Sequence, residues 1–258
     1  CAYTVDDRLA RTQHATLDDQ LHHGVRVLDI RCRHERDRFA IHHGGIPLGL
    51  AFDDVVRTCG QFLAHHPGEC IVMSVKDEWP ARDCTRTFAA TFEWYVARHA
   101  DVRWHLAPEL PLLQTVRGGI VLLRRFTSEK PLGIDLTAWP DNATFDIDNV
   151  VAPFSIQDEF RVPVPISIAF KGRAIESLLD LAPGLCGERW VINFCSGTGM
   201  AATPVVVAAG DARHRGIHEL LAGRLAARSE PCGTMMLDFC DWEDWRHVHA
   251  LIDCNWSR

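Results

Sequence analysis

Short runs of apolar and β-branched residues recur along the chain, each bounded by Gly, Pro or charged residues. Runs of this length and composition are typical of strands buried on both faces. They predict strands over residues 25–32, 39–42, 70–75, 119–123, 150–154, 190–194 and 234–239.

Helical patterns lie between several of these runs. Thr16-Leu-Asp-Asp19 has the form of a capping box that opens a short helix. Apolar residues at three- and four-residue spacing predict helices over 52–66 and 85–99, and further helices are expected over 174–181, 212–227 and 242–252.

Buried strands that alternate with helices favour a parallel sheet with right-handed crossovers, either doubly wound or closed into a barrel. Closure needs eight strands, so a barrel would place one further strand upstream of Cys1. The 258 residues contain no internal repeat, low-complexity tract or Ser/Gly linker, which predicts a single domain over 1–258.

Composition narrows the classes of function. The formal net charge of −7 argues against a nucleic-acid partner, so an anionic ligand would need a focused cationic pocket. No apolar run reaches the roughly 18 residues that a membrane span requires. The 10 cysteines show neither a C-x-x-C pair nor zinc-ligand spacing, which favours a secreted protein with buried thiols and a few disulfides.

Polar residues gather at the expected carboxyl ends of the strands, where both architectures place function. Four cations and a histidine at successive ends predict a pocket for a phosphate. No Gly-rich phosphate loop competes with this interpretation. The residues at these ends are Asp29, Arg31, His43, Lys76, Arg124, Arg125, Asn193 and Asp238.

Asp29 and Arg31 are two residues apart and therefore face the same side of their strand. A guanidinium at Arg31 can bind two phosphate oxygens and offset the charge that grows during phosphoryl transfer. An imidazole at His43 can protonate a departing alkoxide. The alternative is that Asp29 and Arg31 form a structural ion pair and His43 is an ordinary loop histidine.

Longer motifs add a family resemblance. Gln20-Leu-His-His-Gly-Val-Arg-Val-Leu-Asp-Ile-Arg31, then His42-His-Gly44, then Phe62-Leu-Ala-His-His-Pro-Gly-Glu-Cys-Ile-Val-Met-Ser-Val-Lys76 resemble the X domain of the phosphatidylinositol-specific phospholipases C, of the bacterial type. Later segments keep the family's order, including Trp139-Pro-Asp-Asn142, Ile156-Gln-Asp-Glu-Phe160 and Met236-Leu-Asp238.

The resemblance implies a distorted, incompletely closed TIM-type (β/α) barrel that lacks its first strand in this chain. It also implies cleavage of phosphatidylinositol, or of a glycosyl-phosphatidylinositol, to diacylglycerol and inositol 1,2-cyclic phosphate. By the resemblance, His43 is the general acid, Arg31 stabilises the phosphate, Asp29 orients them, and Asp238 polarises the general-base histidine.

The same resemblance assigns substrate binding to four residues. Lys76, Arg125 and Asp158 match residues that hold inositol hydroxyls, and Phe160 replaces an aromatic that lies against the sugar ring. Arg31 stands where calcium-dependent relatives hold a cation, so neither calcium nor another cofactor is expected. We also expect the protein to be a secreted monomer that touches the membrane transiently during catalysis.

One motif of the family is missing. Its general base belongs to a His-Asp-Ser motif that does not occur in these 258 residues, and the full protein is expected to carry it just upstream of Cys1. His14 is the nearest histidine but aligns with a non-catalytic position, so the chain as given is expected to be poorly active. Two alternatives stay open: a catalytically silent inositol-phosphate or membrane-binding module, and a glycerophosphodiester phosphodiesterase.

His214 and His218 have the four-residue spacing of helical zinc ligands, but no Glu follows the first and no third ligand is evident. We therefore expect them on a solvated helix face.

Overall fold

The structure is a computed structural model that describes residues 9–149, 151–226 and 228–255. The fold is mixed α/β, and its contacts gather in two compact units. Among the described residues, unit 1 comprises 25–139, and unit 2 comprises 9–24 together with the described part of 140–255. No helix among the described residues combines the length and the apolar character needed to span a membrane.

A seven-stranded sheet forms unit 1, in the order β3-β2-β1-β4-β6-β5 with β7 also paired to β6. Strands β1, β4, β5, β6 and β7 run parallel in their pairings, whereas β1, β2 and β3 form an antiparallel meander. The strands are β1 (Val27–Glu35), β2 (Arg38–His43), β3 (Ile46–Ala51), β4 (Ile71–Arg82), β5 (Arg103–His105), β6 (Gly119–Arg125) and β7 (Ile134–Asp135).

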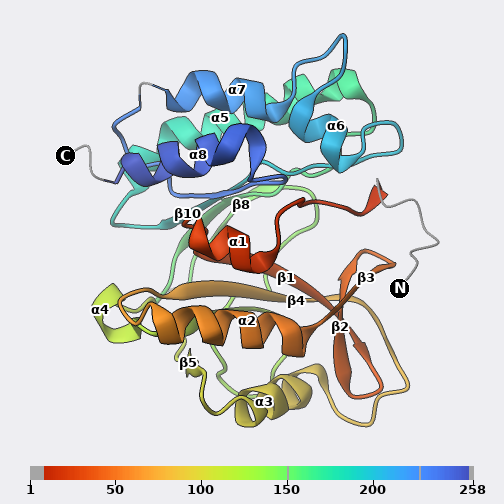
Figure 1. Ribbon diagram of the computed structural model, residues 1–258, viewed down its shortest axis with the longest axis vertical. Coiled ribbons are helices and arrows are strands. Elements are labelled where there is room, and N and C mark those ends of the chain that lie inside the picture. The colour runs from red at the N-terminus through yellow and green to blue at the C-terminus, as the bar shows by residue number, and fades with distance from the viewer. Residues whose placement is uncertain (1–8, 150, 227, 256–258) are drawn as a thin grey trace. The chain divides into compact units, whose positions relative to one another are not determined.

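Helices α2 (Phe52–His65), α3 (Phe88–Arg98) and the short α4 (Leu113–Val116) complete unit 1 (Figure 1). Rings from β2, α2 and α3 pack together in its core: Phe39 stacks on Phe88 and Tyr95, with ring centroids 4.1 and 5.3 Å apart. The Tyr95 hydroxyl also accepts a hydrogen bond from the Phe39 backbone N–H at 3.1 Å. This aromatic core holds β2, and with it His43, against the helices.

A four-stranded sheet forms the centre of unit 2, in the order β11-β10-β9-β8. Strands β9 (Phe154–Gln157), β10 (Trp190–Phe194) and β11 (Thr234–Met236) are parallel, and β8 (Thr144–Ile147) is antiparallel to β9. The helices of this unit are α1 (Leu17–His22), the 3₁₀ turn η2 (Pro165–Ser167), α5 (Ile168–Leu185), α6 (Pro204–Ala209), α7 (Ile217–Leu225) and α8 (Trp242–Asp253).

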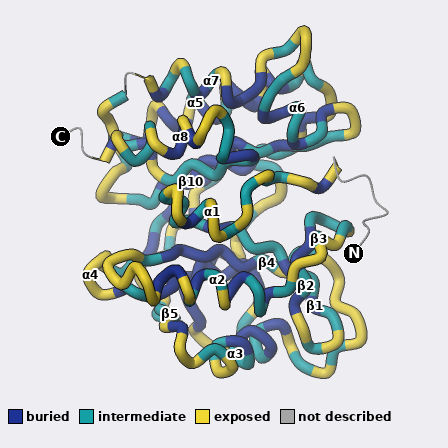
Figure 2. The backbone as a smooth tube through the Cα atoms, in the orientation of Figure 1, coloured by how far each residue is buried: buried dark blue, intermediate teal, exposed yellow. Residues whose placement is uncertain are grey.

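Burial follows the strands in both units (Figure 2). Every residue of β6 and β9 is buried, as is Ile71–Val75 of β4. In unit 2, Ile175, Leu179 and Leu221 from α5 and α7 pack in one cluster with Val207 and Cys195. The helices therefore bury one face against this cluster and expose the other to solvent.

The predicted elements are present with shifted bounds, but the parallel pattern expected for all seven strands is only partly right. β1 and β2 are antiparallel because only Arg36 and Asp37 separate them, with φ angles of 50° and 56° that suit a tight hairpin turn. A parallel crossover needs a much longer connection. The strand expected over 150–154 is β9, Phe154–Gln157, and Val150 lies outside the described residues.

The strands also divide into two separate hydrogen-bonded sheets, neither of which closes on itself. This agrees with an incompletely closed arrangement. The helix expected over 212–227 is α7, Ile217–Leu225, and residue 227 lies outside the described part of the chain.

Candidate functional site

Three cations lie in one row across the sheet of unit 1. In the parallel register, Arg31 of β1 pairs with Lys76 of β4, and Lys76 pairs with Arg125 of β6. Registered residues of parallel strands point to the same face. The structure thus brings together the three cations that the sequence assigned to separate strand ends.

Asp29 supplies the negative charge beside this row. Its Oδ2 accepts a hydrogen bond from Arg31 Nε at 2.8 Å, and its Oδ1 accepts one from the Ser74 hydroxyl at 2.8 Å and lies 3.5 Å from an Arg125 nitrogen. Burial alone would raise the pKa of Asp29, but the charges of Arg31 and Arg125 outweigh it and lower the pKa to about 2. Asp29 is therefore ionised at neutral pH and fixes both guanidinium groups.

Glu78 is a second buried carboxylate at the site, and the sequence analysis missed it. Its Oε1 accepts hydrogen bonds from Arg31 at 3.3 Å and from the Gly44 backbone N–H at 3.0 Å, and its Oε2 lies 2.7 Å from Lys76 Nζ. Burial opposes ionisation, but Arg31 and Lys76 lower the pKa of Glu78 overall. One carboxylate thus joins two cations of the row to the turn that follows His43.

A sequence signal for Glu78 existed. Ser74, Lys76 and Glu78 continue the two-residue alternation that identified Asp29 and Arg31. The predicted strand ended at residue 75, whereas β4 extends to Arg82 and carries Glu78 within it.

His43 ends β2, and Gly44 follows it with a φ of 54°, which favours glycine. The neighbouring His42 is buried, and burial lowers its pKa, which favours the neutral ring. His43 is only partly buried and pairs with Ile46 of β3. The Gly44–Glu78 hydrogen bond ties this end of β2 to the Arg31 guanidinium.

The two arginines at the end of β6 have different environments. Arg125 is buried, with its guanidinium carbon 3.7 Å from the centre of the Trp139 ring. Arg124 instead pairs with Asp135 at 2.5 Å and donates to the Leu132 and Phe126 carbonyls at 2.8 and 2.5 Å. The interpretation of Arg124 as part of the phosphate pocket was wrong, because its neighbour Arg125 faces the row and Arg124 faces away.

In unit 2, Asp158 and Phe160 follow β9. Asp158 is buried, and its backbone N–H donates to the Ala143 carbonyl at 2.9 Å. The Phe160 carbonyl accepts a hydrogen bond from the Thr198 N–H at 2.8 Å, and the Arg161 guanidinium lies 5.8 Å from the Phe160 ring centre. Both residues therefore sit on a segment whose backbone is fixed.

A buried polar network underlies this segment. Gln157 accepts from Lys171 Nζ at 2.8 Å and from the Glu159 N–H at 2.7 Å, and donates to Asn193 Oδ1 at 2.8 Å. Asn193 in turn donates to the Ile175 carbonyl at 2.9 Å. Burial lowers the pKa of Lys171 to about 8, against the opposing charges of groups that include Asp158 and Asp238.

Asn193 is thus fully buried within the network rather than at a ligand site. Lys171 was missed because it precedes the helix predicted over 174–181, whereas α5 begins at Ile168.

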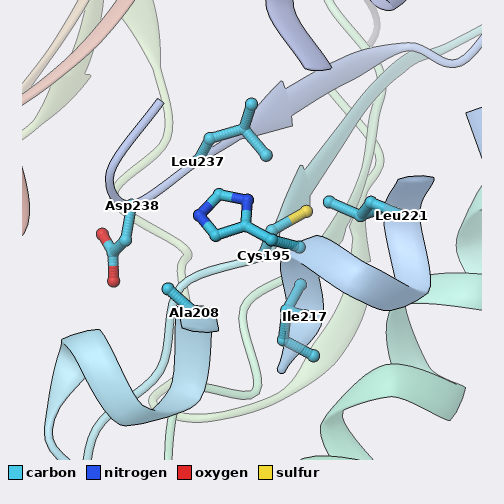
Figure 3. A pocket seen from close by; sticks show the side chains of 7 residues that line it. Cys195, Ala208, Ile217, Leu221, Leu237 and Asp238 are labelled. Atoms are coloured by element: carbon cyan, nitrogen blue, oxygen red, sulfur yellow. The ribbon is translucent and has the colours of Figure 1, made fainter. Parts of the chain in front are cut away.

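Asp238 follows β11 and lines a small pocket together with Cys195, Ala208, Ile217, His218, Leu221 and Leu237 (Figure 3). His218 is buried, so the expectation that it lies on a solvated helix face was wrong. Its ring stacks on Trp242 and on His247 with centroids 5.0 Å from each. Helix α8 covers the face of α7 that the sequence pattern predicted to be exposed to solvent.

His14 lies near the same segment of unit 2. Its Nδ1 is 3.8 Å from Asp241 Oδ2, and its ring centroid is 4.7 Å from that of Phe239. Asp241 therefore supplies a carboxylate beside His14.

Among the described residues, one group has ligand atoms close enough to hold a metal ion: His34, Asp37 and Cys84. The Asp37 carboxylate already accepts hydrogen bonds from the Thr85 and Arg86 N–H groups, both at 2.9 Å. His34 Nε2 lies 2.9 Å from the Thr91 hydroxyl. These contacts tie the β1–β2 turn to the segment after β4. They explain why the three side chains lie close together without a bound metal ion.

Comparisons with known proteins identify a family to which these residues are similar. The family model for the X domain of phosphatidylinositol-specific phospholipase C matches residues 2–126. The 1-phosphatidylinositol phosphodiesterase of Listeria monocytogenes is 28% identical over 251 residues, which cover 95% of this chain and 74% of that protein. Its namesake from Staphylococcus aureus strain Newman is 30% identical over 164 residues, which cover 59% of this chain and 53% of that protein.

Solved structures agree with this assignment. A mutant of the S. aureus phosphatidylinositol-specific phospholipase C superposes with a TM-score of 0.84 at 25% identity, covering 98% of this chain and 88% of that one. A second S. aureus structure, which concerns modulation of membrane binding, gives a TM-score of 0.80 at 25% identity over 98% of this chain and 87% of that one. Residues 2–126 thus match the X domain of phosphatidylinositol-specific phospholipase C, and nearly the whole chain is similar in sequence and fold to bacterial enzymes of that name.

Proposed function

We propose that this protein is a phosphatidylinositol diacylglycerol-lyase. The 2-hydroxyl of the inositol attacks the phosphorus, the bond to the glycerol oxygen breaks, and diacylglycerol leaves with inositol 1,2-cyclic phosphate as the second product. The substrate is phosphatidylinositol or a glycosyl-phosphatidylinositol. The names of the relatives and the site in unit 1 both support this reaction.

The observation that carries the proposal is the row Arg31–Lys76–Arg125, held by Asp29 and Glu78. A guanidinium fixed by two carboxylates is preorganised to stabilise the oxygens of a phosphorane as charge develops on them. The Glu78 bond to Gly44 keeps the end of β2 beside that guanidinium. We assign protonation of the departing glycerol oxygen to His43, because it matches the family's general acid and directly precedes Gly44.

The remaining roles rest on matches to the family's motifs. Lys76, Arg125 and Asp158 bind inositol hydroxyls, Phe160 offers an apolar face to the sugar ring, and Asp238 orients the general base. The buried network around Gln157 supports the role of Asp158, because it fixes the strand end from which Asp158 extends.

Calcium independence follows from the chemistry of the Arg31 environment. Calcium binds six to eight oxygen ligands. Here the guanidinium of Arg31 already occupies the space between the Asp29 and Glu78 carboxylates and supplies a positive charge to both. Turnover should be unchanged in excess EDTA, and a loss that added Ca²⁺ restores would contradict this part of the proposal.

A second candidate function is a catalytically silent module that binds the headgroup. The observation in its favour is that Arg31, Lys76 and Arg125 are present and organised, which headgroup binding without turnover would also require. The glycerophosphodiester hydrolase gains no such support, because Arg31 stands where a carboxylate metal ligand would be needed.

We further propose that the protein is a secreted monomer that contacts the membrane surface only during turnover. The membrane-binding work on the S. aureus relative supports the transient contact. In keeping with the net charge of −7, no nucleic-acid partner is proposed.

Product release and binding measured side by side decide between the two functions. Vesicles containing phosphatidylinositol are assayed for inositol 1,2-cyclic phosphate, and inositol 1-phosphate binding is measured by calorimetry. The lyase predicts slow release that His43→Ala abolishes while binding persists, and the exposed His65→Ala serves as control. Binding without release would favour the silent module, and the absence of both would refute either function.

A further inference from the structure

Cys232 and Cys254 bring their sulfur atoms together in the core of unit 2. The two Sγ atoms are 3.9 Å apart, and each residue is only 5% exposed. Cys232 lies just before β11, and Cys254 follows the last residue of α8. Both belong to the same apolar cluster, so the side chains have little freedom to move apart.

The chain around this pair is fixed by further contacts. Cys254 Sγ donates to the Arg228 carbonyl at 3.3 Å, and Cys232 Sγ donates to the Glu230 carbonyl at 3.7 Å. The Arg228 guanidinium donates to the Leu179 carbonyl at 2.8 Å, which anchors the loop to α5. Two thiols that approach from separate elements are thus held at the ends of short, restrained segments.

Burial, with a smaller contribution from Cys254, raises the pKa of Cys232 to about 11 against the opposing charge of Arg228. A thiol with this pKa is a poor nucleophile at neutral pH. The pair is therefore suited to a stable cross-link and not to rapid thiol exchange.

We propose that Cys232 and Cys254 close to an intramolecular disulfide when the protein meets a small disulfide oxidant such as glutathione disulfide. One thiolate attacks an oxidant sulfur and releases one glutathione thiolate, and the second cysteine then displaces the other glutathione from the mixed disulfide. The two cysteines together lose two protons and two electrons, and the oxidant gains them as two thiols. A rotation of the side chains brings the sulfurs to the roughly 2 Å of a disulfide bond.

The bond would tie the start of β11 to the end of α8 across 21 intervening residues. Between these two points lies the segment that carries Asp238 and the His247 ring. Closing a loop of this size restricts the unfolded chain, and the oxidised protein should melt on the order of 5–10 °C higher than the reduced protein.

Peptide mapping tests the proposal directly. The full chain is incubated with glutathione disulfide or with reduced glutathione, remaining thiols are alkylated, and the digest is analysed by mass spectrometry. We expect one dominant cross-linked peptide joining Cys232 to Cys254 that disappears after reduction. Recovery of both cysteines in alkylated form from the oxidised sample would overturn the proposal, as would preferential linkage of either residue to another cysteine.

Thermal melting of variants adds a second readout. Cys232→Ser and Cys254→Ser should each abolish the difference in Tm between oxidised and reduced protein. Cys59→Ala removes another buried thiol, from α2 in unit 1, and should leave that difference intact. A redox-dependent Tm that survives in Cys232→Ser would contradict the assignment, and if a serine variant fails to fold, the peptide map of the unmodified chain decides alone.

Discussion

Glu78 shows how one side chain organises the candidate site. It contacts Arg31, Lys76 and the Gly44 backbone, and its side chain is only 6% exposed. Arg31 lies on β1, Lys76 on β4 and Gly44 in the turn after β2, so the position of each relative to the others depends on this carboxylate. Losing its charge would leave two cations without a fixed geometry.

Glu78→Gln should therefore reduce turnover, or headgroup binding if the chain is silent, by roughly tenfold or more, because the amide cannot neutralise both cations. The free energy of unfolding should fall by about 1–3 kcal/mol. Steady-state assays and urea unfolding measure the two effects. Glu93→Gln breaks the exposed pair with Lys130 and should change neither; equal effects in both variants would contradict a role specific to the site.

At the same scale, the sequence predicted the residues that a two-residue alternation makes visible. Asp29 and Arg31 stand on one face of β1 as expected, and Lys76 and Arg125 join them through the register. Glu78 and Lys171 were not predicted as functional residues, because their contacts come from tertiary pairing that no local pattern encodes. Arg124 was wrongly included, because two adjacent arginines cannot face the same side of one strand.

At the scale of elements, the polar network of unit 2 joins β9, β10 and α5. Gln157 connects Lys171 on the helix to Asn193 on the neighbouring strand, and all three side chains are buried. Buried polar groups stabilise a fold only when all of them are satisfied. The three residues should therefore behave as one unit.

Gln157→Leu should cost about 3 kcal/mol, because it leaves the Lys171 ammonium without its acceptor. Adding Lys171→Met removes that stranded charge, so the double variant should cost less than the sum of the single variants by about 1 kcal/mol or more. Urea unfolding of the cycle measures this coupling. The control pairs Gln157→Leu with Glu219→Gln at an exposed position of α7, and should be additive; additivity in both cycles would show that the network is not coupled.

The stacked histidines between α7 and α8 predict a pH effect. Burial, with a smaller contribution from the neighbouring His247, lowers the pKa of His218 from 6.5 to about 4. Burial also lowers the pKa of His247, with Arg246 adding to the effect and Glu243 opposing it. The backbone of Asp238 slightly favours protonation of His218.

Because the unfolded chain binds these protons more readily, stability is fully present above about pH 6.5 and falls as the pH drops towards 4, by roughly 3 kcal/mol for His218. Over this range, the protection of α7 and α8 amides against hydrogen exchange should fall relative to the intrinsic exchange rate at each pH. His218→Phe keeps the flat ring and should flatten the profile, whereas His214→Asn, at the partly exposed His214, should not. An unchanged slope in His218→Phe would refute this explanation.

Local patterns predicted most elements, and the errors have physical causes. The strand over 190–194 has the predicted bounds, and the helix expected over 52–66 is Phe52–His65. The sequence analysis missed β3, because its exposed residues include Pro47 and Gly49, which argue against a strand. Strand pairing and the division into two sheets depend on contacts between distant segments, which periodicity does not report.

At the scale of the whole molecule, the way in which the two units share the chain supports the prediction of a single domain. Unit 2 takes residues from both sides of unit 1, so its described part is not one continuous piece of chain. Within unit 2, Gln13 donates to the Leu237 carbonyl at 2.7 Å, and the Phe239 N–H donates to the Thr12 carbonyl at 2.7 Å. Completing unit 2 therefore requires segments that unit 1 separates in sequence.

We accordingly predict one cooperative unfolding transition. Leu179→Ala creates a cavity in the core of unit 2 and should cost about 2–5 kcal/mol. If the chain unfolds as one domain, the slowest amides of β10 in unit 2 and of β4 in unit 1 should lose the same amount of free energy of opening, as measured by native-state hydrogen exchange. Ile120→Ala in the core of unit 1 is the reciprocal variant. It should also lower the free energy of opening of the amides in both strands. A loss confined to the mutated unit in either variant would show two independently unfolding domains.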